Sequence, residues 1–179
     1  MTALEKSKFL TLLHDQIKNE FTASQQYIAV AYHFDSNDLP QLARHFYEQA
    51  NEERNHAMMI IAYFLDKHIQ VTVPGVDEVR TEWADILAPL EFSLQQEKDV
   101  TEQVVQLASA ARDEGDYVGE QFMQWFLKEQ VEEVATMNTL VTVAKRAGDN
   151  LFDLEDFVAR EMSAAKAEAG APRAAGGNI

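Results

Sequence analysis

The sequence contains no cysteine among its 179 residues. This absence excludes disulfide bonds and thiolate ligands, so any metal site must use oxygen and nitrogen donors. Hard or borderline cations such as iron, manganese or zinc suit these donors. The chain also shows no amino-terminal basic start followed by an apolar run, and no stretch approaches membrane-spanning length. The sequence therefore predicts a cytoplasmic protein that does not bind a membrane.

Basic residues are scarce relative to acidic ones. The chain has 15 Lys and Arg against 30 Asp and Glu, which gives a formal net charge of −15. Such a charge repels the phosphates of nucleic acids and of anionic lipids and attracts cations. We therefore expect no nucleic-acid partner. The same acidity also favours solubility, and total charge alone does not distinguish this role from cation binding.

Glycine and proline are also rare, with seven and four residues, and they separate long segments of helical periodicity. The pattern predicts helices over about 5–36, 40–67, 89–112, 116–148 and 150–162. Pro40 suits the first turn of the second helix, with Asn37 or Asp38 available as a cap. Residues 69–76 predict extended chain because β-branched residues alternate there before a Pro-Gly break.

The lengths of these segments indicate how the helices are connected. A helix of 28 residues is about 42 Å long, while 18 extended residues reach about 60 Å. The second connection can therefore run the whole length of the bundle and make the second and third helices parallel. We predict an all-α domain over residues 1–163, a four-helix bundle with one long crossover and a short fifth helix. Residues 164–179 form a flexible Ala/Gly-rich tail, a candidate for docking onto a larger partner.

Each long helix has a stripe of apolar residues along one face, and near its middle this stripe contains a polar residue of a kind that can bind a metal ion. Leu13 and Ile17 precede Glu20, and the other stripes are interrupted by Glu53 with His56, by Glu97, and by Gln130 with Glu133. The steps of three and four keep each set on one helix face. A buried carboxylate is costly without a partner, so four inward-facing sites suggest a shared cation.

The motif Glu53-x-x-His56 puts a carboxylate and an imidazole one turn apart, a pairing that di-iron and di-manganese bundles use. Alone this motif is weak, and its place on an apolar stripe strengthens it. The larger pattern comprises Asn19-Glu20 with Tyr27 seven residues on, residues 52–57, Gln96-Glu97 with Thr101, and residues 124–133. With these pieces the chain resembles a non-haem bacterial ferritin of the actinobacterial type over about residues 5–162.

The resemblance implies a ferritin-like fold, a hollow homo-oligomeric cage of 24 subunits and a role for each ligand. Glu20, Glu53 and His56 would hold one iron, with Glu53 bridging to a second iron held by Glu97 and Glu133. Gln130 would lie near both irons, and Tyr27 would be oxidisable by the site. A third iron position would map to Glu52, Glu129 and Glu132.

The resemblance also indicates which iron chemistry to expect. In haem-carrying bacterioferritins a methionine follows the bridging glutamate, and a second Glu-x-x-His lies on the fourth helix. Here the corresponding residues are Arg54 and the Gln130-x-x-Glu133 pair, so we expect no haem. We predict a ferroxidase that oxidises Fe²⁺ with dioxygen or hydrogen peroxide and stores a ferric mineral in its cage.

Two other readings remain open on the sequence. One is a di-metal oxidase or peroxidase of the ferritin-like superfamily that forms no cage, and the other is a structural bundle whose glutamates pair with Arg or Lys. Asp116 and Glu120 suit either a three-fold iron pore or an acidic first turn that complements the helix dipole. The remaining histidines fall off the ligand stripes, and we expect them at the surface or an interface; they are His14, His33, His45 and His68.

Overall fold

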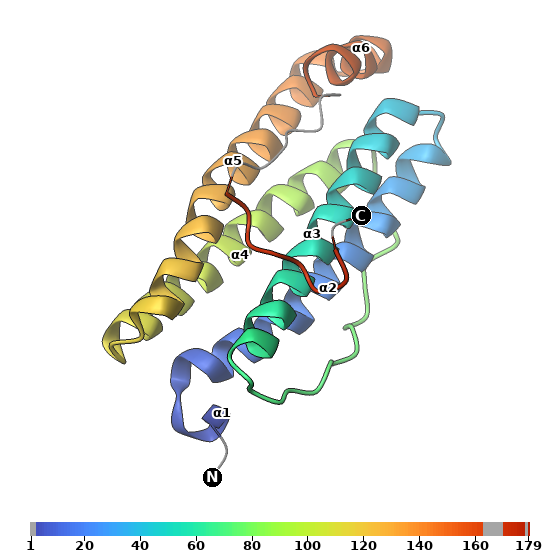
Figure 1. Ribbon diagram of the computed structural model, residues 1–179. Coiled ribbons are helices and arrows are strands. Elements are labelled where there is room, and N and C mark those ends of the chain that lie inside the picture. The colour runs from blue at the N-terminus through green and yellow to red at the C-terminus, as the bar shows by residue number, and fades with distance from the viewer. Residues whose placement is uncertain (1–2, 163–169, 178) are drawn as a thin grey trace.

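The computed structural model describes residues 3–162, 170–177 and 179, and all regular secondary structure in these residues is helical. The elements are α1 (Ala3–Lys6), α2 (Lys8–Asp35), α3 (Pro40–Asp66), α4 (Leu87–Asp113), α5 (Tyr117–Ala147) and α6 (Leu151–Glu161). The four long helices form a bundle, and α6 lies at one end of it (Figure 1). The predicted four-helix bundle with a short fifth helix is confirmed. No helix in the described ranges is both long and apolar enough to span a membrane.

The predicted long crossover between α3 and α4 is present, and the structure shows that it runs along α2. Near the start of α2, His14 Nε2 lies 2.8 Å from the carbonyl oxygen of Thr72. Farther along, the Gln26 side chain makes two 2.8 Å hydrogen bonds with the backbone of Arg80. The connection therefore follows α2 from its first turns towards its far end. Figure 1 shows this connection as the green irregular segment beside the bundle.

The predicted first helix is interrupted at Ser7, which corrects the expected range of 5–36. Ser7 has extended backbone angles, and its Oγ accepts a hydrogen bond from Leu10 N at 3.0 Å. Serine is a favoured N-cap because its short side chain satisfies an amide that the first turn leaves free. Glu114 completes this cap, because Oε1 accepts from Lys8 N at 2.6 Å and from Phe9 N at 3.1 Å.

The cap predicted for the next helix is wrong. The N-cap of α3 is Leu39, and neither Asn37 nor Asp38 bonds to its first turn. Glu155 of α6 takes this place, accepting from Gln41 N at 2.8 Å and from Leu42 N at 2.9 Å. Since a carboxylate is favoured at a helix N-terminus, this contact anchors α6 to the bundle.

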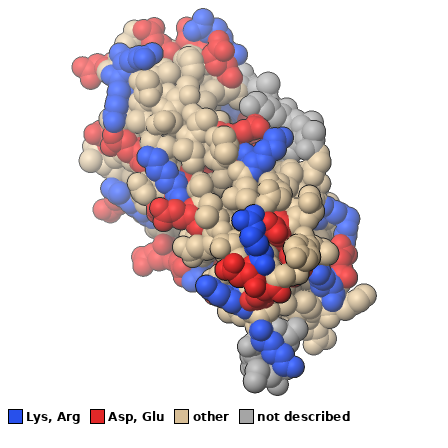
Figure 2. Space-filling view, turned by 90° about the vertical axis from the view of Figure 1, so that its left-hand side faces the viewer, with Lys and Arg blue, Asp and Glu red and all other residues tan. Residues whose placement is uncertain are grey.

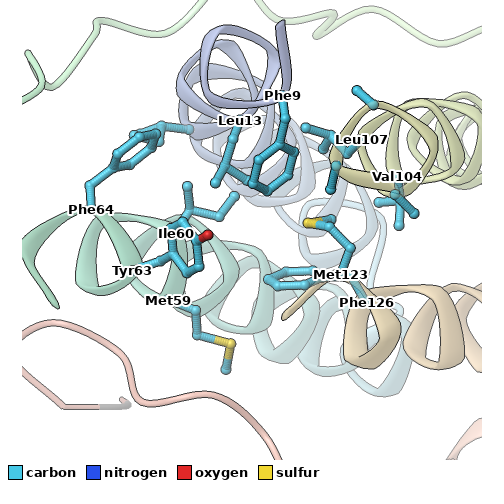
Figure 3. Close-up of a cluster of buried hydrophobic side chains, with 14 of the residues drawn as sticks. Phe9, Leu13, Met59, Ile60, Tyr63, Phe64, Val104, Leu107, Met123 and Phe126 are labelled. Carbon is cyan, nitrogen blue, oxygen red and sulfur yellow. The ribbon is translucent and has the colours of Figure 1, made fainter. Parts of the chain in front are cut away.

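The apolar core consists of two clusters at opposite ends of the bundle. Figure 3 shows one cluster, to which α2 contributes Phe9 and Leu13, α3 Phe64, α4 Leu107 and α5 Met123. The second cluster lies around Tyr27, Phe34, Phe46 and other apolar residues, and it also receives α6. The polar residues predicted to interrupt the stripes fall in sequence between these two clusters on every long helix.

We expected the four remaining histidines at the surface or an interface, but His45 is buried within the chain. His45 is buried on α3 and lines a small cavity together with Val158 and Met162 of the α6 end. Burial lowers the pKa of His45 to about 4, while Glu48 opposes this shift. The docking of α6 explains the burial, which the periodicity of α3 alone does not reveal.

The tail has a defined place where the structure describes it. Ala174 and Ala175 are buried, and Ala175 N donates to the Met58 carbonyl at 3.0 Å. Arg173 also pairs with Asp66 at 2.8 Å, so this segment lies on α3. The predicted flexibility of residues 164–179 stays a prediction, and residues 163–169 and 178 lie outside the described ranges.

The face of the molecule in Figure 2 carries acidic and basic side chains in mixed groups. Ion pairs at the surface of the molecule include Lys145 with Glu91, 2.7 Å apart, and Arg44 with Glu48 at 2.9 Å. Isolated or paired cations differ from the continuous basic stripe that binds a phosphate backbone. That the chain has no nucleic-acid partner stays a prediction.

Candidate metal centre

The side chains that interrupt the four apolar stripes are buried. Each of the predicted inner residues is at most 7% exposed: Glu20, Glu53, His56, Glu97, Gln130 and Glu133. They sit on helices that the apolar residues on either side hold against one another, so the bundle core fixes their positions. The sequence prediction that these residues face inward is therefore confirmed.

Three of these residues form a compact group of possible metal ligands. Glu20 on α2 and Glu53 and His56 on α3 each offer a ligand atom, and these atoms lie within 4.8 Å of one another. His56 Nδ1 is 3.2 Å from Glu53 Oε2. Glu20 Oε2 and His56 Nε2 are buried without a hydrogen-bond partner. Buried polar atoms are normally satisfied, so these unpartnered atoms point to a missing ligand.

Glu97 of α4 is held from two neighbouring helices. The hydroxyl group of Tyr27, which is fully buried on α2, donates to Glu97 Oε1, and Glu97 Oε2 has no partner. The Thr101 hydroxyl lies 2.7 Å from the Glu97 carbonyl oxygen and 2.9 Å from Gln130 Oε1. Tyr27 and Gln130 thus both lie at this side of the centre.

The electrostatics of the centre favour protonated carboxyl groups when no metal is bound. Burial and the neighbouring Glu97 raise the pKa of Glu53 and of Glu133 well above the usual value. Burial also raises the pKa of Glu97 to about 7, although the hydrogen bond from Tyr27 opposes this rise. Like charges and low polarity both disfavour ionisation. A divalent cation would reverse this preference by replacing the protons.

Aromatic rings cover His56 on the side of α5. The ring centroid of Trp125 lies 5.5 Å from that of His56 and that of Phe126 lies 5.7 Å away, both in edge-on orientation. These rings pack against the imidazole, which is 2% exposed. Packing is thus the observed role of Trp125.

The residues predicted for a third iron lie on α3 and α5, beside the inner group. Glu52 is partly buried and accepts a hydrogen bond from Gln49 Nε2, Glu129 is partly buried, and Glu132 is exposed. They therefore lie farther from the core than Glu53 and Glu133. The third iron site stays a prediction.

Asp116 and Glu120 have structural partners at the start of α5. Asp116 is the N-cap and accepts from Gly119 N at 2.9 Å. Glu120 accepts from Arg112 Nε at 2.8 Å and from Nη2 at 2.6 Å. Of the two roles considered for Asp116, the structure shows the one at the start of α5. A role in an iron pore stays a prediction for both residues.

The sequence analysis missed Gln16, which is buried on α2 and donates from Nε2 to Glu20 Oε1 at 2.9 Å. The sequence feature that could have indicated Gln16 is its spacing from Glu20, since residues four apart on a helix lie on one face. Glutamine is common on solvated faces, and only the packing of α4 against α2 shows that Gln16 is enclosed.

Comparisons with known proteins agree with this geometry. A sequence model of the ferritin-like domain matches residues 10–147. Ferritin BfrB of Mycolicibacterium smegmatis is 64% identical over 173 residues, covering 97% of this chain and 96% of the relative. Ferritin BfrB of Mycobacterium tuberculosis is 60% identical over 174 residues, with the same coverage of both chains. A bacterial non-heme ferritin of Staphylococcus aureus is 35% identical over 141 residues, covering 79% of this chain and 85% of the relative.

The fold is also similar to that of solved structures. An open-pore ferritin from the archaeon Archaeoglobus fulgidus superposes with a TM-score of 0.82 at 29% sequence identity. The match covers 86% of this chain and 95% of that structure. The similarity in fold therefore extends over nearly the whole bundle.

Proposed function

The chain belongs to the ferritin family and stores iron, and on this premise we propose that it is a ferroxidase with a di-iron centre inside each subunit. Two Fe²⁺ ions bind between the four long helices, are oxidised, and leave as Fe³⁺ for a mineral in a hollow homo-oligomeric cage of 24 subunits. The protein acts in the cytoplasm, and its centre uses no haem.

The observation that carries this proposal is the convergence of unpartnered ligand atoms in the core. Glu20 Oε2, His56 Nε2 and Glu97 Oε2 come from three helices, and all three are buried without a hydrogen-bond partner. In the described ranges, the ion pairs of Lys and Arg involve other acidic residues, such as Asp77, Glu91 and Glu120. The reading as a purely structural bundle is thus disfavoured, because it requires basic partners for the inner glutamates.

The proposed ligands divide into two positions that share Glu53. Glu20, Glu53 and His56 hold one Fe²⁺, and Glu53, Glu97 and Glu133 hold the other, with Gln130 close to both. Carboxylate oxygens are hard donors, which stabilise Fe³⁺ more than Fe²⁺. The donor set therefore favours loss of an electron from each ion. Each Fe²⁺ loses one electron and becomes Fe³⁺. Dioxygen takes up the two electrons with two protons from solvent to give hydrogen peroxide, or hydrogen peroxide takes them up to give two water molecules.

The protein residues handle the protons that accompany these changes. Glu53, Glu97 and Glu133 release protons as the cations bind, because the positive charge replaces the proton at each carboxylate. Tyr27 donates its hydroxyl hydrogen to Glu97 and so orients one of that residue's oxygens. The other oxygen of Glu97 remains available for metal.

The test is to add Fe²⁺ aerobically to the purified protein and to measure oxidation, particle mass and retained iron together. We expect rapid oxidation and iron that elutes with a large particle. Glu53→Ala should abolish the rapid phase, whereas the matched variant Glu48→Ala, on the same helix but bonded to Arg44 at the surface, should retain it.

A small particle that oxidises an organic substrate and retains no iron would instead support a di-metal oxidase or peroxidase. Unchanged oxidation in Glu53→Ala would contradict the proposal.

A further inference from the structure

Gln16 lies on α2, one turn before Glu20, and its side chain is almost completely enclosed. It is 2% exposed, and its Nε2 donates to Glu20 Oε1 at 2.9 Å. Because the second oxygen of Glu20 is buried and has no hydrogen-bond partner, the two oxygens of this carboxylate differ. One is occupied by an amide of the protein, and the other is left for a ligand.

Two further amides determine how Gln16 is oriented. Gln103 of α4 accepts at Oε1 from Gln16 Nε2 at 3.0 Å and from Asn19 Nδ2 at 3.2 Å. Asn19 Nδ2 also lies 3.1 Å from Gln16 Oε1. If the Gln16 amide were reversed, its oxygen would face the Glu20 carboxylate and the Gln103 carbonyl, which are both acceptors. The network therefore permits one orientation, with the NH₂ group towards Glu20.

We propose that Gln16, supported by Gln103, is a positioning residue that fixes Glu20 so that it binds Fe²⁺ through one oxygen. The inference rests on the ferroxidase function proposed above and adds a residue that acts through Glu20. Without the amide, Glu20 is free to rotate about its side-chain bonds and to turn both oxygens towards the metal. Outer partners that orient metal ligands commonly change metal affinity by 10–100-fold. We expect an effect of this size at the position formed by Glu20, Glu53 and His56.

The same helix provides a matched control in Gln26. Gln26 is also buried, at 4% exposed, and both ends of its amide are hydrogen bonded. Its partner is the Arg80 backbone in the long connection, so it has no link to Glu20. Gln26→Leu should lower the stability of the metal-free protein, but it should leave metal binding unchanged.

The experiment is a titration of the assembled, metal-free protein with Co²⁺, followed by visible absorption, with thermal unfolding of the same samples. For wild-type protein we expect two Co²⁺ per subunit in the buried centre. In Gln16→Leu, one of them should bind 10–100-fold more weakly and with an altered spectrum, while the other keeps its affinity. Gln103→Leu should show a smaller change in the same direction, because the amide of Gln16 remains. Gln26→Leu should titrate like wild type.

The outcomes separate this inference from the function on which it rests. If wild type binds Co²⁺ in the centre and Gln16→Leu titrates like Gln26→Leu, the inference is wrong and the ferroxidase proposal stands. If wild type shows no buried Co²⁺ and no oxidation of Fe²⁺, both are wrong. Should Gln16→Leu fail to assemble, Gln103→Leu decides, since it replaces a partly buried side chain at the rim of the network. Weaker binding of one Co²⁺ supports the proposal, and wild-type binding overturns it.

Discussion

At the scale of single residues, the glutamates of the centre are placed where ionisation is unfavourable. Burial is the main cause for Glu53, Glu97 and Glu133, and the mutual repulsion of the carboxylates adds to it. Such an arrangement lowers the stability of the metal-free protein, and it is typical of functional sites. The proposed iron ligands are therefore also residues whose replacement should stabilise the metal-free fold.

Glu97 makes the stability of the metal-free protein depend on pH. Its pKa is about 7 in the folded chain against an ordinary value of 4.5, so between these values the folded state holds a proton that the unfolded state has lost. The free energy of unfolding of the metal-free protein should therefore fall as the pH rises from 4.5 through 7, by at most about 3 kcal/mol from this group. The measurement is the thermal unfolding midpoint at pH 6 and at pH 8.

Replacement variants isolate this contribution. Glu97→Gln should be more stable than wild type at pH 8 without metal, and its midpoint should depend less on pH. The control Glu91→Gln lies on α4 like Glu97, but it removes a half-exposed carboxylate that pairs with Lys145 of α5, so it should keep the wild-type pH dependence. An identical pH dependence in both variants would show that Glu97 does not carry it.

Replacing Tyr27 should also change the pKa of Glu97. Its hydroxyl stabilises the ionised form of Glu97, so Tyr27→Phe should raise the pKa of Glu97 further. Metal binding must then displace a more tightly held proton, and the pH of half-maximal Co²⁺ binding should move upward. Titration with Co²⁺ at a series of pH values measures this shift. A shift to lower pH would contradict the assigned direction of the hydrogen bond.

At the scale of helices, the ends of the elements are fixed by contacts that are remote in sequence. The apolar periodicity was sufficient to predict the existence of all four long helices and of the short one. It could not predict that Glu114 completes the start of α2 or that Glu155 caps α3, because these partners are more than 100 residues away. Rules for helix caps consider only residues that are near in sequence, and they therefore favoured Asn37 and Asp38.

The cap from Glu155 has a measurable contribution. Glu155→Ala leaves the amides of Gln41 and Leu42 without their acceptor and loosens the contact between α6 and α3. Loss of a cap typically lowers the free energy of unfolding by about 1–2 kcal/mol. The thermal midpoint should fall by a matching amount, whereas Glu161→Ala at the exposed end of α6 should change it little. Equal effects of both variants would refute the capping role.

Gly119 shows how closely α5 approaches α2. A Cβ atom added at Gly119 would lie 2.4 Å from Cε1 of Phe9, whose ring is fully buried in the first core cluster. Because the enclosed ring has no room to move, Gly119→Ala should destabilise the protein by about 1–3 kcal/mol. Combining it with Phe9→Leu should restore part of this loss relative to the sum of the single variants. Strict additivity in calorimetric unfolding would contradict the clash.

At the scale of the whole molecule, a polar layer separates two apolar clusters. The sequence predicted that Glu20, Glu53, Glu97 and Glu133 face inward because they break apolar stripes, which is a local signal. Gln16 and Gln103 escaped prediction because their enclosure depends on how α4 packs against α2. The burial of His45 escaped it too, since α6 covers that face of α3. Periodicity thus identifies the side chains that face inward, and tertiary packing determines which of them support the ligands.

Metal binding should therefore stabilise the whole bundle. Anaerobic addition of Fe²⁺ or Zn²⁺ should raise the thermal unfolding midpoint, because the cations bind the folded state and relieve repulsion among the carboxylates. Near pH 7 it should also release protons, which a pH-stat records. Glu53→Ala should lose both responses while it remains folded. A flat thermal response in wild-type protein would mean that the buried carboxylates do not act as a cation site.

The most direct measurement of the central claim is anomalous diffraction at the iron absorption edge from crystals loaded anaerobically with Fe²⁺. Two iron peaks per subunit are expected in the core, one bonded to Glu20, Glu53 and His56 and the other to Glu53, Glu97 and Glu133. Iron found only on surface carboxylates, with no peak between the helices, would contradict the account.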